Sequence, residues 1–263
     1  MGWLMRLSHL LEHIEPIEIS GRVAQAVGMV VEGYGPMTTV GELCRITRGE
    51  GEAPIMAEVV GFRGDRVLLM PLGDMRGIGP ASRITMTGQV ASLAVGPGLL
   101  GRILDGCGDP IDGKGMPKTS HCYPLHAAAP NPLQRARIRD PLDLGIRAIN
   151  GFLTCGRGQK MGIFSGSGVG KSVLLGMISR YTKADVNVIA LLGERGREVN
   201  EFLERDLGAD ALARTVVVVA TSDQAPLIRL RAALVATTIA EYFRDAGQQV
   251  LLLMDSLTRL AYS

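Results

Sequence analysis

A glycine-rich segment that ends in Gly-Lys-Ser limits what this chain can fold into more than any other feature of its sequence. The segment runs from Phe164 to Ser172, between an apolar run over residues 161–164 and a helical pattern over residues 173–181. A strand, a glycine-rich loop and a helix in this order are what a phosphate-binding P-loop requires. The segment therefore predicts a nucleotide-binding site, and the alternative is an ordinary glycine-rich turn.

The residue types of this loop fit the chemistry of phosphate binding. Its glycines let successive backbone N–H groups point at phosphate oxygens, beside a helix N-terminus that favours negative charge. Lys171 can reach the β- and γ-phosphates, and the Ser172 hydroxyl can ligate Mg²⁺. Ser165 stands where the full pattern has glycine. The residues predicted to contact the nucleotide are Ser165, Gly166, Ser167, Gly168, Val169, Gly170, Lys171 and Ser172.

Composition argues against several other classes of protein. The net charge is +2, from 28 basic and 26 acidic residues, which is too balanced for a nucleic-acid binder that relies on phosphate contacts. No apolar run is long enough to span a bilayer, and Arg6, His9 and Glu12 interrupt the apolar core that a signal peptide would need. The cysteines have no metal-ligand spacing. We therefore expect reduced thiols in a cytosolic protein with no specific nucleic-acid partner.

Changes in residue pattern and composition along the chain predict four segments. Residues 1–18 contain an amphipathic helical pattern, whose apolar face we expect to dock on a partner because so short a helix is marginal alone. Residues 19–95 consist of short β-type runs separated by glycine turns, which indicates a small β-barrel. Residues 96–150 form a connector rich in proline and glycine that packs against the core, and residues 151–263 form an α/β domain.

Within the α/β domain, apolar strand patterns alternate with helical patterns. The predicted strands cover residues 160–164, 186–192, 215–221 and 249–254, and the predicted helices cover about 172–182, 197–207 and 226–246. Near-continuous apolar strands that alternate with helices predict a parallel sheet covered on both faces.

Glu194 is the first candidate for catalysis. It follows the strand predicted over residues 186–192, on the carboxyl side where open parallel sheets bind ligands. A carboxylate at this place can orient and polarise the water that attacks a γ-phosphate. The alternative is a solvated, salt-bridged turn made by Glu194, Arg195, Arg197 and Glu198.

Asp255 is the second acidic candidate. It follows four hydrophobic residues, Leu251 to Met254, at the end of the last predicted strand. This is the Walker-B arrangement, in which a buried strand supplies one carboxylate to the Mg²⁺ shell. The pattern is weak alone, but a P-loop upstream makes it a strong indication of an Mg²⁺-dependent nucleotide site.

Taken together, these motifs resemble the type III secretion ATPases, a family that includes the flagellar protein-export ATPase and is related to the catalytic subunit of rotary ATP synthases. The resemblance covers nearly the whole chain, through residues 101–106, 110–113, 143–150, 165–177, 193–198, 241–245 and 251–259. It implies an N-terminal β-barrel, a RecA-like nucleotide domain and a homo-hexameric ring with ATP at the subunit interfaces. The implied activity is Mg²⁺-dependent ATP hydrolysis that energises protein export.

The same resemblance implies roles and partners. Lys171 and Ser172 would be the phosphate and Mg²⁺ residues, Glu194 the general base, and Asp255 a support for Mg²⁺. Arg195, and with it Arg259, would sense the γ-phosphate or support the catalytic groups. The implied partners are a stator-like regulatory protein, export-gate components, and secretion substrates with their chaperones. The implied location is the cytoplasm, peripheral at the inner face of the bacterial cytoplasmic membrane.

Other interpretations compete with this one. A subunit of a rotary ATP synthase and a virulence-type secretion ATPase share the motifs. A non-catalytic ring subunit would keep the P-loop and lack the carboxylate at 194. A Rho-like RNA translocase would need aromatic stacking platforms, whereas residues 1–100 contain only Trp3, Tyr34 and Phe62.

The resemblance also bears on where the chain ends. In the related ATPases, a later strand inserts between the P-loop strand and the Walker-B strand, and an arginine finger and a helical C-terminal domain follow. We therefore expect a fragment of a longer protein, poorly active alone, with a slot in the sheet between residues 160–164 and 250–254.

Overall fold

The computed structural model describes residues 19–35, 37–49, 52–166 and 168–262. The chain divides into two compact units, Met1–Ala91 and Ser92–Ser263. The predicted fold class, a small β-barrel followed by a parallel-sheet domain, is confirmed. The amphipathic helix predicted within residues 1–18 lies outside the described residues.

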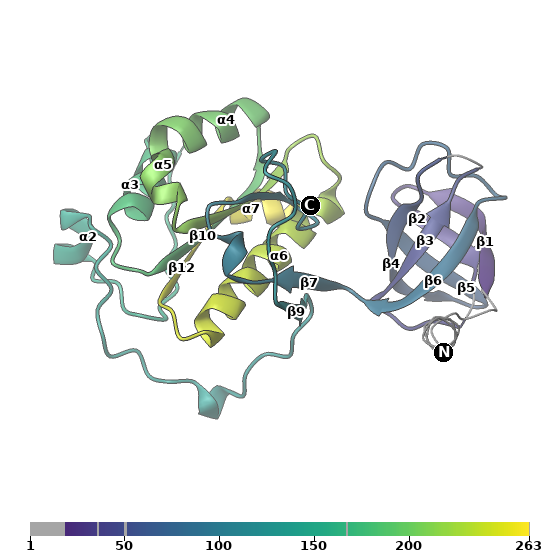
Figure 1. Ribbon diagram of the computed structural model, residues 1–263, viewed down its shortest axis with the longest axis horizontal. Helices are drawn as coiled ribbons and strands as arrows, with labels where there is room; N and C mark the ends of the chain where they lie inside the picture. The colour runs from purple at the N-terminus through teal and green to yellow at the C-terminus, as the bar shows by residue number, and fades with distance from the viewer. Residues whose placement is uncertain (1–18, 36, 50–51, 167, 263) are drawn as a thin grey trace, which may run out of the picture. The chain divides into compact units, whose positions relative to one another are not determined.

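The first unit is a closed six-stranded antiparallel barrel (Figure 1). Its strands are β1 (Ser20–Val27), β2 (Val30–Tyr34), β3 (Glu42–Thr47), β4 (Ile55–Arg63), β5 (Arg66–Pro71) and β6 (Arg83–Val90), in the order β1-β2-β5-β4-β3-β6. In β4 and β5 buried positions alternate with more exposed ones, so that every second side chain points inward. The barrel core consists of Val23, Val31, Cys44, Ile46, Ala57, Val59, Val67, Leu69 and Ile84.

The second unit contains a four-stranded parallel sheet in the order β12-β10-β11-β8. Its strands are β8 (Ile103–Asp105), β10 (Val186–Glu194), β11 (Thr215–Thr221) and β12 (Val250–Asp255). β10 and β11 are buried at every position except the last, as their continuous apolar sequences predict. A separate antiparallel ribbon joins β7 (Ser92–Val95) to β9 (His121–Pro124).

Helices cover this sheet (Figure 1). The helices of this unit are α2 (Arg147–Phe152), α3 (Lys171–Tyr181), α4 (Gly196–Glu201), the π-helical η3 (Phe202–Leu207), α5 (Gly208–Leu212), α6 (Pro226–Asp245) and α7 (Leu257–Ala261). Two single 3-10 turns, η1 (Pro97–Leu99) and η2 (Pro132–Gln134), lie in the preceding segment. Side chains of α3, α4, η3 and α5 share one core with β10 and β11, and α6 packs against β10, β11 and β12.

β8 is an element that the sequence did not predict, because it lies in the segment interpreted as a connector. It is only three residues long, and its place in the sheet depends on pairing with β11. A buried ion pair next to it holds the following loop: Arg102 Nε lies 2.6 Å from Asp112 Oδ2. The hydrogen bonds from Arg102 hold the pKa of the Asp112 carboxyl well below its usual range. Residues 96–150 therefore contribute to the sheet itself.

The prediction of a strand over residues 160–164 is wrong. These residues form no strand, and Met161, Ile163 and Phe164 are exposed, Phe164 by 97% of its surface. An apolar run becomes a strand only where a neighbouring backbone pairs with it. β12 pairs with β10, and among the described residues no strand pairs with its other edge. Residues 160–164 and β12 are therefore not paired neighbours.

The close packing of α3 on η3 requires a residue without a side chain at position 176. A Cβ atom on Gly176 would lie 2.6 Å from the backbone oxygen of Asp206, nearer than real contacts allow. We therefore expect Gly176→Ala to lower the free energy of unfolding by about 1–3 kcal/mol, measured by urea denaturation. Gly151→Ala in α2 is the control, because a Cβ there meets nothing within 4 Å. Equal stability of the two variants would contradict this packing.

Candidate nucleotide-binding site

The candidate site lies where β10 and β12 end and α3 begins. β10 ends at Glu194, β12 ends at Asp255, and α3 starts at Lys171. Because β10 and β12 are parallel neighbours, their carboxyl ends share one edge of the sheet. The fold thus gathers at one edge three residues that the sequence analysis had singled out separately.

The loop before α3 has the backbone that glycine permits. Gly168 and Gly170 have φ angles of 76° and 95°, in the left-handed region that other residues avoid. The first helical bond runs from Leu174 N to Gly170 O over 2.9 Å, so α3 is helical from its first turn. The N–H groups of that turn have no acceptor within the helix, and the helix dipole adds positive potential there. Such a terminus suits an anionic phosphate.

The loop residues themselves are open to solvent. Ser165, Gly166 and the segment 168–170 are exposed, Val169 by 72% of its surface, and Ser172 is exposed at the second position of α3. Ser167 lies outside the described residues. The predicted nucleotide contacts at 165, 166 and 168–172 therefore form an accessible surface at the start of the helix.

Lys171 and Asp255 form an ion pair between Lys171 Nζ and Asp255 Oδ1. The Asp255 side chain is buried, and 30% of the Lys171 side chain is exposed. The two residues are 84 positions apart in the sequence. The pair places the ammonium group expected at the phosphates directly beside the carboxylate expected at the metal.

Glu194 is partly buried, and its pKa is raised above the ordinary value. Its Oε2 lies 3.3 Å from Arg259 Nη2, and its carboxyl shares a hydrogen bond with Glu198. Burial, then the hydrogen bond to Glu198, raise the pKa of Glu194 to about 7, against the opposing charge of Arg259. The pKa of Glu198 is lowered by the same hydrogen bond. With its pKa raised in this way, an ionised Glu194 is a base strong enough to accept a proton near neutral pH.

Arg195 and Arg259, for which the resemblance implied similar roles, make different contacts. Arg195 lies at the start of α4, where its Nη1 is 3.3 Å from Glu198 Oε1, and its side chain is 64% exposed. Arg259 instead reaches Glu194 and donates to the backbone oxygen of Gly193. The salt-bridged turn considered for this segment is thus present between Arg195 and Glu198. Glu198 also shares a hydrogen bond with Glu194. In the sequence, only the spacing of these two glutamates, i and i+4, could have suggested this contact.

The shifted pKa of Glu194 predicts how stability depends on pH. A folded-state pKa above the ordinary 4.5 means that the folded chain holds this proton more tightly than the unfolded chain. The resulting stabilisation is complete below pH 4.5 and is lost as the pH rises through about 7. Unfolding free energies of wild type and Glu194→Gln should therefore diverge between pH 5 and 8, with wild type losing at most about 3 kcal/mol relative to the variant. Parallel pH profiles would contradict the shift.

The donor atoms fit a hard divalent cation such as Mg²⁺. A hydroxyl at Ser172 and a carboxylate at Asp255 are oxygen ligands, which Mg²⁺ prefers. Within the described ranges, no cluster of three or more His, Cys, Asp or Glu side chains could hold a metal by itself. A cation here would therefore complete its shell with water and phosphate oxygens, as Mg²⁺ does in phosphate-transfer sites.

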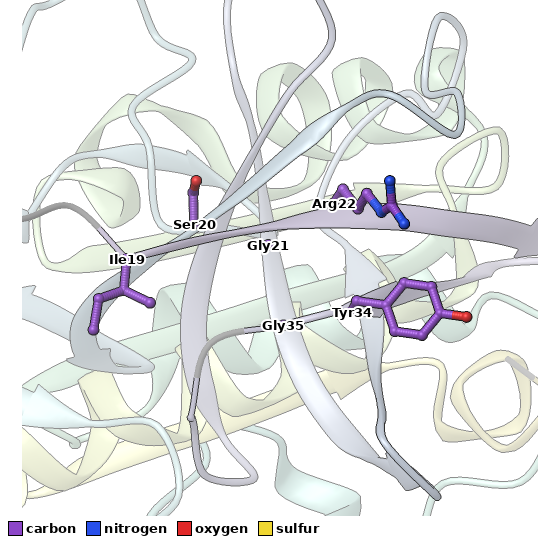
Figure 2. Close-up of a pocket in the computed structure, with 6 residues that line it drawn as sticks. All are labelled: Ile19, Ser20, Gly21, Arg22, Tyr34 and Gly35. Carbon is purple, nitrogen blue, oxygen red and sulfur yellow. The ribbon is translucent and has the colours of Figure 1, made fainter.

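A concavity lies on the barrel (Figure 2). It has a volume of about 420 Å³ and is lined by Ile19, Ser20, Gly21, Arg22, Tyr34 and Gly35. Arg22 and Tyr34 lie together there, with the guanidinium carbon 5.7 Å from the ring centroid. Of these six residues only Arg22 is charged at neutral pH, so the hollow lacks the acid, base and phosphate-loop groups of the site on the sheet.

Two family models match the chain. The model described as "ATP synthase alpha/beta family, nucleotide-binding domain" matches residues 145–263. The model described as "ATP synthase alpha/beta family, beta-barrel domain" matches residues 23–88. Together with the barrel, the parallel sheet and the P-loop, these matches show that the chain belongs to the ATP synthase alpha/beta family.

Within this family, the chain is similar to proteins of type III export. It is 50% identical over 242 residues to the "Flagellum-specific ATP synthase" of Bacillus subtilis, covering 92% of this chain and 55% of that protein. It is also 50% identical over 241 residues to the "Type 3 secretion system ATPase" of Xanthomonas euvesicatoria, covering 92% and 54%. The chain thus spans about half the length of the curated relatives that it matches.

A solved structure agrees with these similarities. The assembled ATPase EscN of the enteropathogenic E. coli type III secretion system superposes with a TM-score of 0.84 at 44% identity, covering 92% of this chain and 58% of that chain. None of the helices in the described part of this chain is long and apolar enough to cross a membrane.

Proposed function

We propose that the protein hydrolyses Mg-ATP as a ring ATPase that energises type III protein export, in its flagellar form. The observation that carries this proposal is the meeting of Lys171, Glu194 and Asp255 at the carboxyl edge of the sheet, beside the glycine loop. The similarity to flagellum-specific ATP synthases and a type 3 secretion ATPase supports the export assignment.

Each residue has a distinct task in the proposed reaction. The backbone N–H groups of the loop and Lys171 bind and orient the phosphates. Ser172 and Asp255 would hold Mg²⁺, which when bound would neutralise charge on the phosphate oxygens. Glu194 orients the attacking water and accepts its proton. Arg259 lies against Glu194 and holds that carboxylate in place, and Arg195 would sense the γ-phosphate.

The proposed assembly is a homo-hexamer with ATP at the subunit interfaces. It is supported by the likeness to EscN, which has been solved as an assembled ATPase and in complex with its central stalk EscO. We extend the proposal to a stalk or stator-like partner, export-gate components, and secretion substrates with chaperones. The proposed location is the cytoplasm, at the inner face of the cytoplasmic membrane.

Loss of the gene tests the export assignment against the alternatives. We expect a deletion strain to stop releasing flagellar proteins into the medium, while proton-driven ATP synthesis by its membrane vesicles stays at the wild-type level. A second readout is ATP hydrolysis by the purified full-length protein, which should rise per protomer as concentration favours assembly. Normal flagellar secretion with impaired ATP synthesis would favour a rotary ATP synthase subunit, and loss of other secreted proteins would favour a virulence-type ATPase.

A further inference from the structure

The ion pair between Lys171 and Asp255 joins the two groups that the proposed function assigns to different ligands. Asp255 is only 4% exposed, so its carboxylate has little access to water. It forms an ion pair with the Lys171 ammonium, which comes from the first residue of α3. In this structure each group therefore neutralises the other inside the site.

Phosphate binding would disturb this balance. The Lys171 ammonium is a single point charge, and a phosphate that draws it away leaves Asp255 without its partner. A buried carboxylate that loses its cation is costly, and a second carboxyl, Glu194, is near enough to feel its charge. Arg259 is already engaged with Glu194 and with the backbone oxygen of Gly193. Binding of phosphate without a cation is therefore opposed, because it would leave the buried Asp255 carboxylate without its positively charged partner.

The same argument holds for a divalent cation alone. A cation that approaches Asp255 meets the Lys171 ammonium, and repulsion between like charges opposes it. When both ligands arrive, Lys171 turns to the phosphate and Asp255 to the cation. Each buried charge then exchanges one partner of opposite sign for another, and neither is left unpaired.

We propose that the Lys171–Asp255 ion pair couples phosphate binding to divalent-cation binding, so that each ligand strengthens the other through the partner that it releases. The inference rests on the proposed nucleotide site. Because coupling between two ligands is reciprocal, it is measurable from either ligand. Removal of the metal ligand Asp255 should therefore increase the affinity for nucleotide in the absence of a divalent cation.

The experiment compares ADP affinity with Mg²⁺ and with EDTA, by calorimetry on the full-length protein. In wild type we expect Mg²⁺ to tighten ADP binding by at least about tenfold. In Asp255→Asn we expect metal-free ADP to bind about tenfold more tightly than in wild type, with little further gain from Mg²⁺. Asp210→Asn is the control, because Asp210 is exposed in α5.

Ser172→Ala separates the ion pair from metal ligation. It removes the other proposed Mg²⁺ ligand and leaves the pair intact, so it should reduce the gain from Mg²⁺ without tightening metal-free binding. Reductive methylation of lysines, followed by mass spectrometry, reports on the pair directly. Lys171 should react several-fold faster in Asp255→Asn than in wild type, while the exposed Lys160 keeps its rate.

The outcomes are distinguishable. Equal ADP affinity of wild type with and without Mg²⁺, or no tightening of metal-free binding in a folded Asp255→Asn, overturns the coupling and leaves the nucleotide site standing. If that variant fails to fold, Asp255→Ser carries the same expectation, and the wild-type comparison still decides. Absence of ADP binding under both conditions would overturn the nucleotide site and the coupling with it.

Discussion

Glu194→Gln is expected to stop ATP hydrolysis by the assembled full-length protein while ATP still binds. An amide keeps the shape of the side chain, but it cannot accept the proton of the attacking water. Loss of a general base costs about 10²- to 10⁴-fold in rate. The raised pKa of Glu194 fits this role, because a base is most useful when it titrates near the working pH.

Turnover and nucleotide affinity are measured separately, by phosphate release and by fluorescent-nucleotide binding. Glu204→Gln is the matched control, since Glu204 is exposed on η3 within the same unit. Turnover of Glu194→Gln at the wild-type rate would move the base to another residue. Glu198, which shares a hydrogen bond with Glu194, would be the next candidate.

Lys171→Ala is expected to weaken binding of Mg-ADP by about 10- to 100-fold, the effect of losing charge-assisted hydrogen bonds to phosphate. The substitution also leaves Asp255 buried beside an alanine, so the variant should unfold at a lower urea concentration. Affinity is therefore measured by calorimetry well below the unfolding transition.

The matched control is Lys160→Ala, because Lys160 is exposed ahead of the loop and outside the glycine motif. It should change neither affinity nor stability. If Lys171→Ala bound Mg-ADP as tightly as this control, the assignment of the loop to phosphate binding would be wrong.

Elements with a long, uninterrupted pattern could be predicted from the sequence. β10 and β11 are near-continuous apolar runs, and their position in a buried parallel sheet follows from that composition. The start of α3 was predictable from Gly-Lys-Ser, since the glycine before the lysine permits the left-handed turn that begins the helix. Glu194 and Asp255 were predictable as strand-end residues because the ends of parallel strands collect ligands.

Other features depend on neighbours that a local pattern does not encode. β8 has three residues and is a strand because β11 lies beside it. Residues 160–164 have the apolar composition of a strand, but they pair with no strand among the residues that the structure describes. The contact of Lys171 with Asp255 joins residues distant in the sequence, and no spacing rule identifies it. The arginine that lies against Glu194 is Arg259 of α7, and no local pattern identifies this contact either.

Three of the six strand pairings in the barrel, β2–β5, β3–β6 and β1–β6, join strands that are not consecutive in the chain. β2 and β3 follow each other in the chain but are not neighbours: β2 lies between β1 and β5, and β3 lies between β4 and β6. A protease cut in the connection between β2 and β3 would therefore divide the chain without separating the strands on either side of it. The β1–β2 piece would keep its hydrogen bonds to β5 and to β6, so we expect the two pieces to stay associated after the cut.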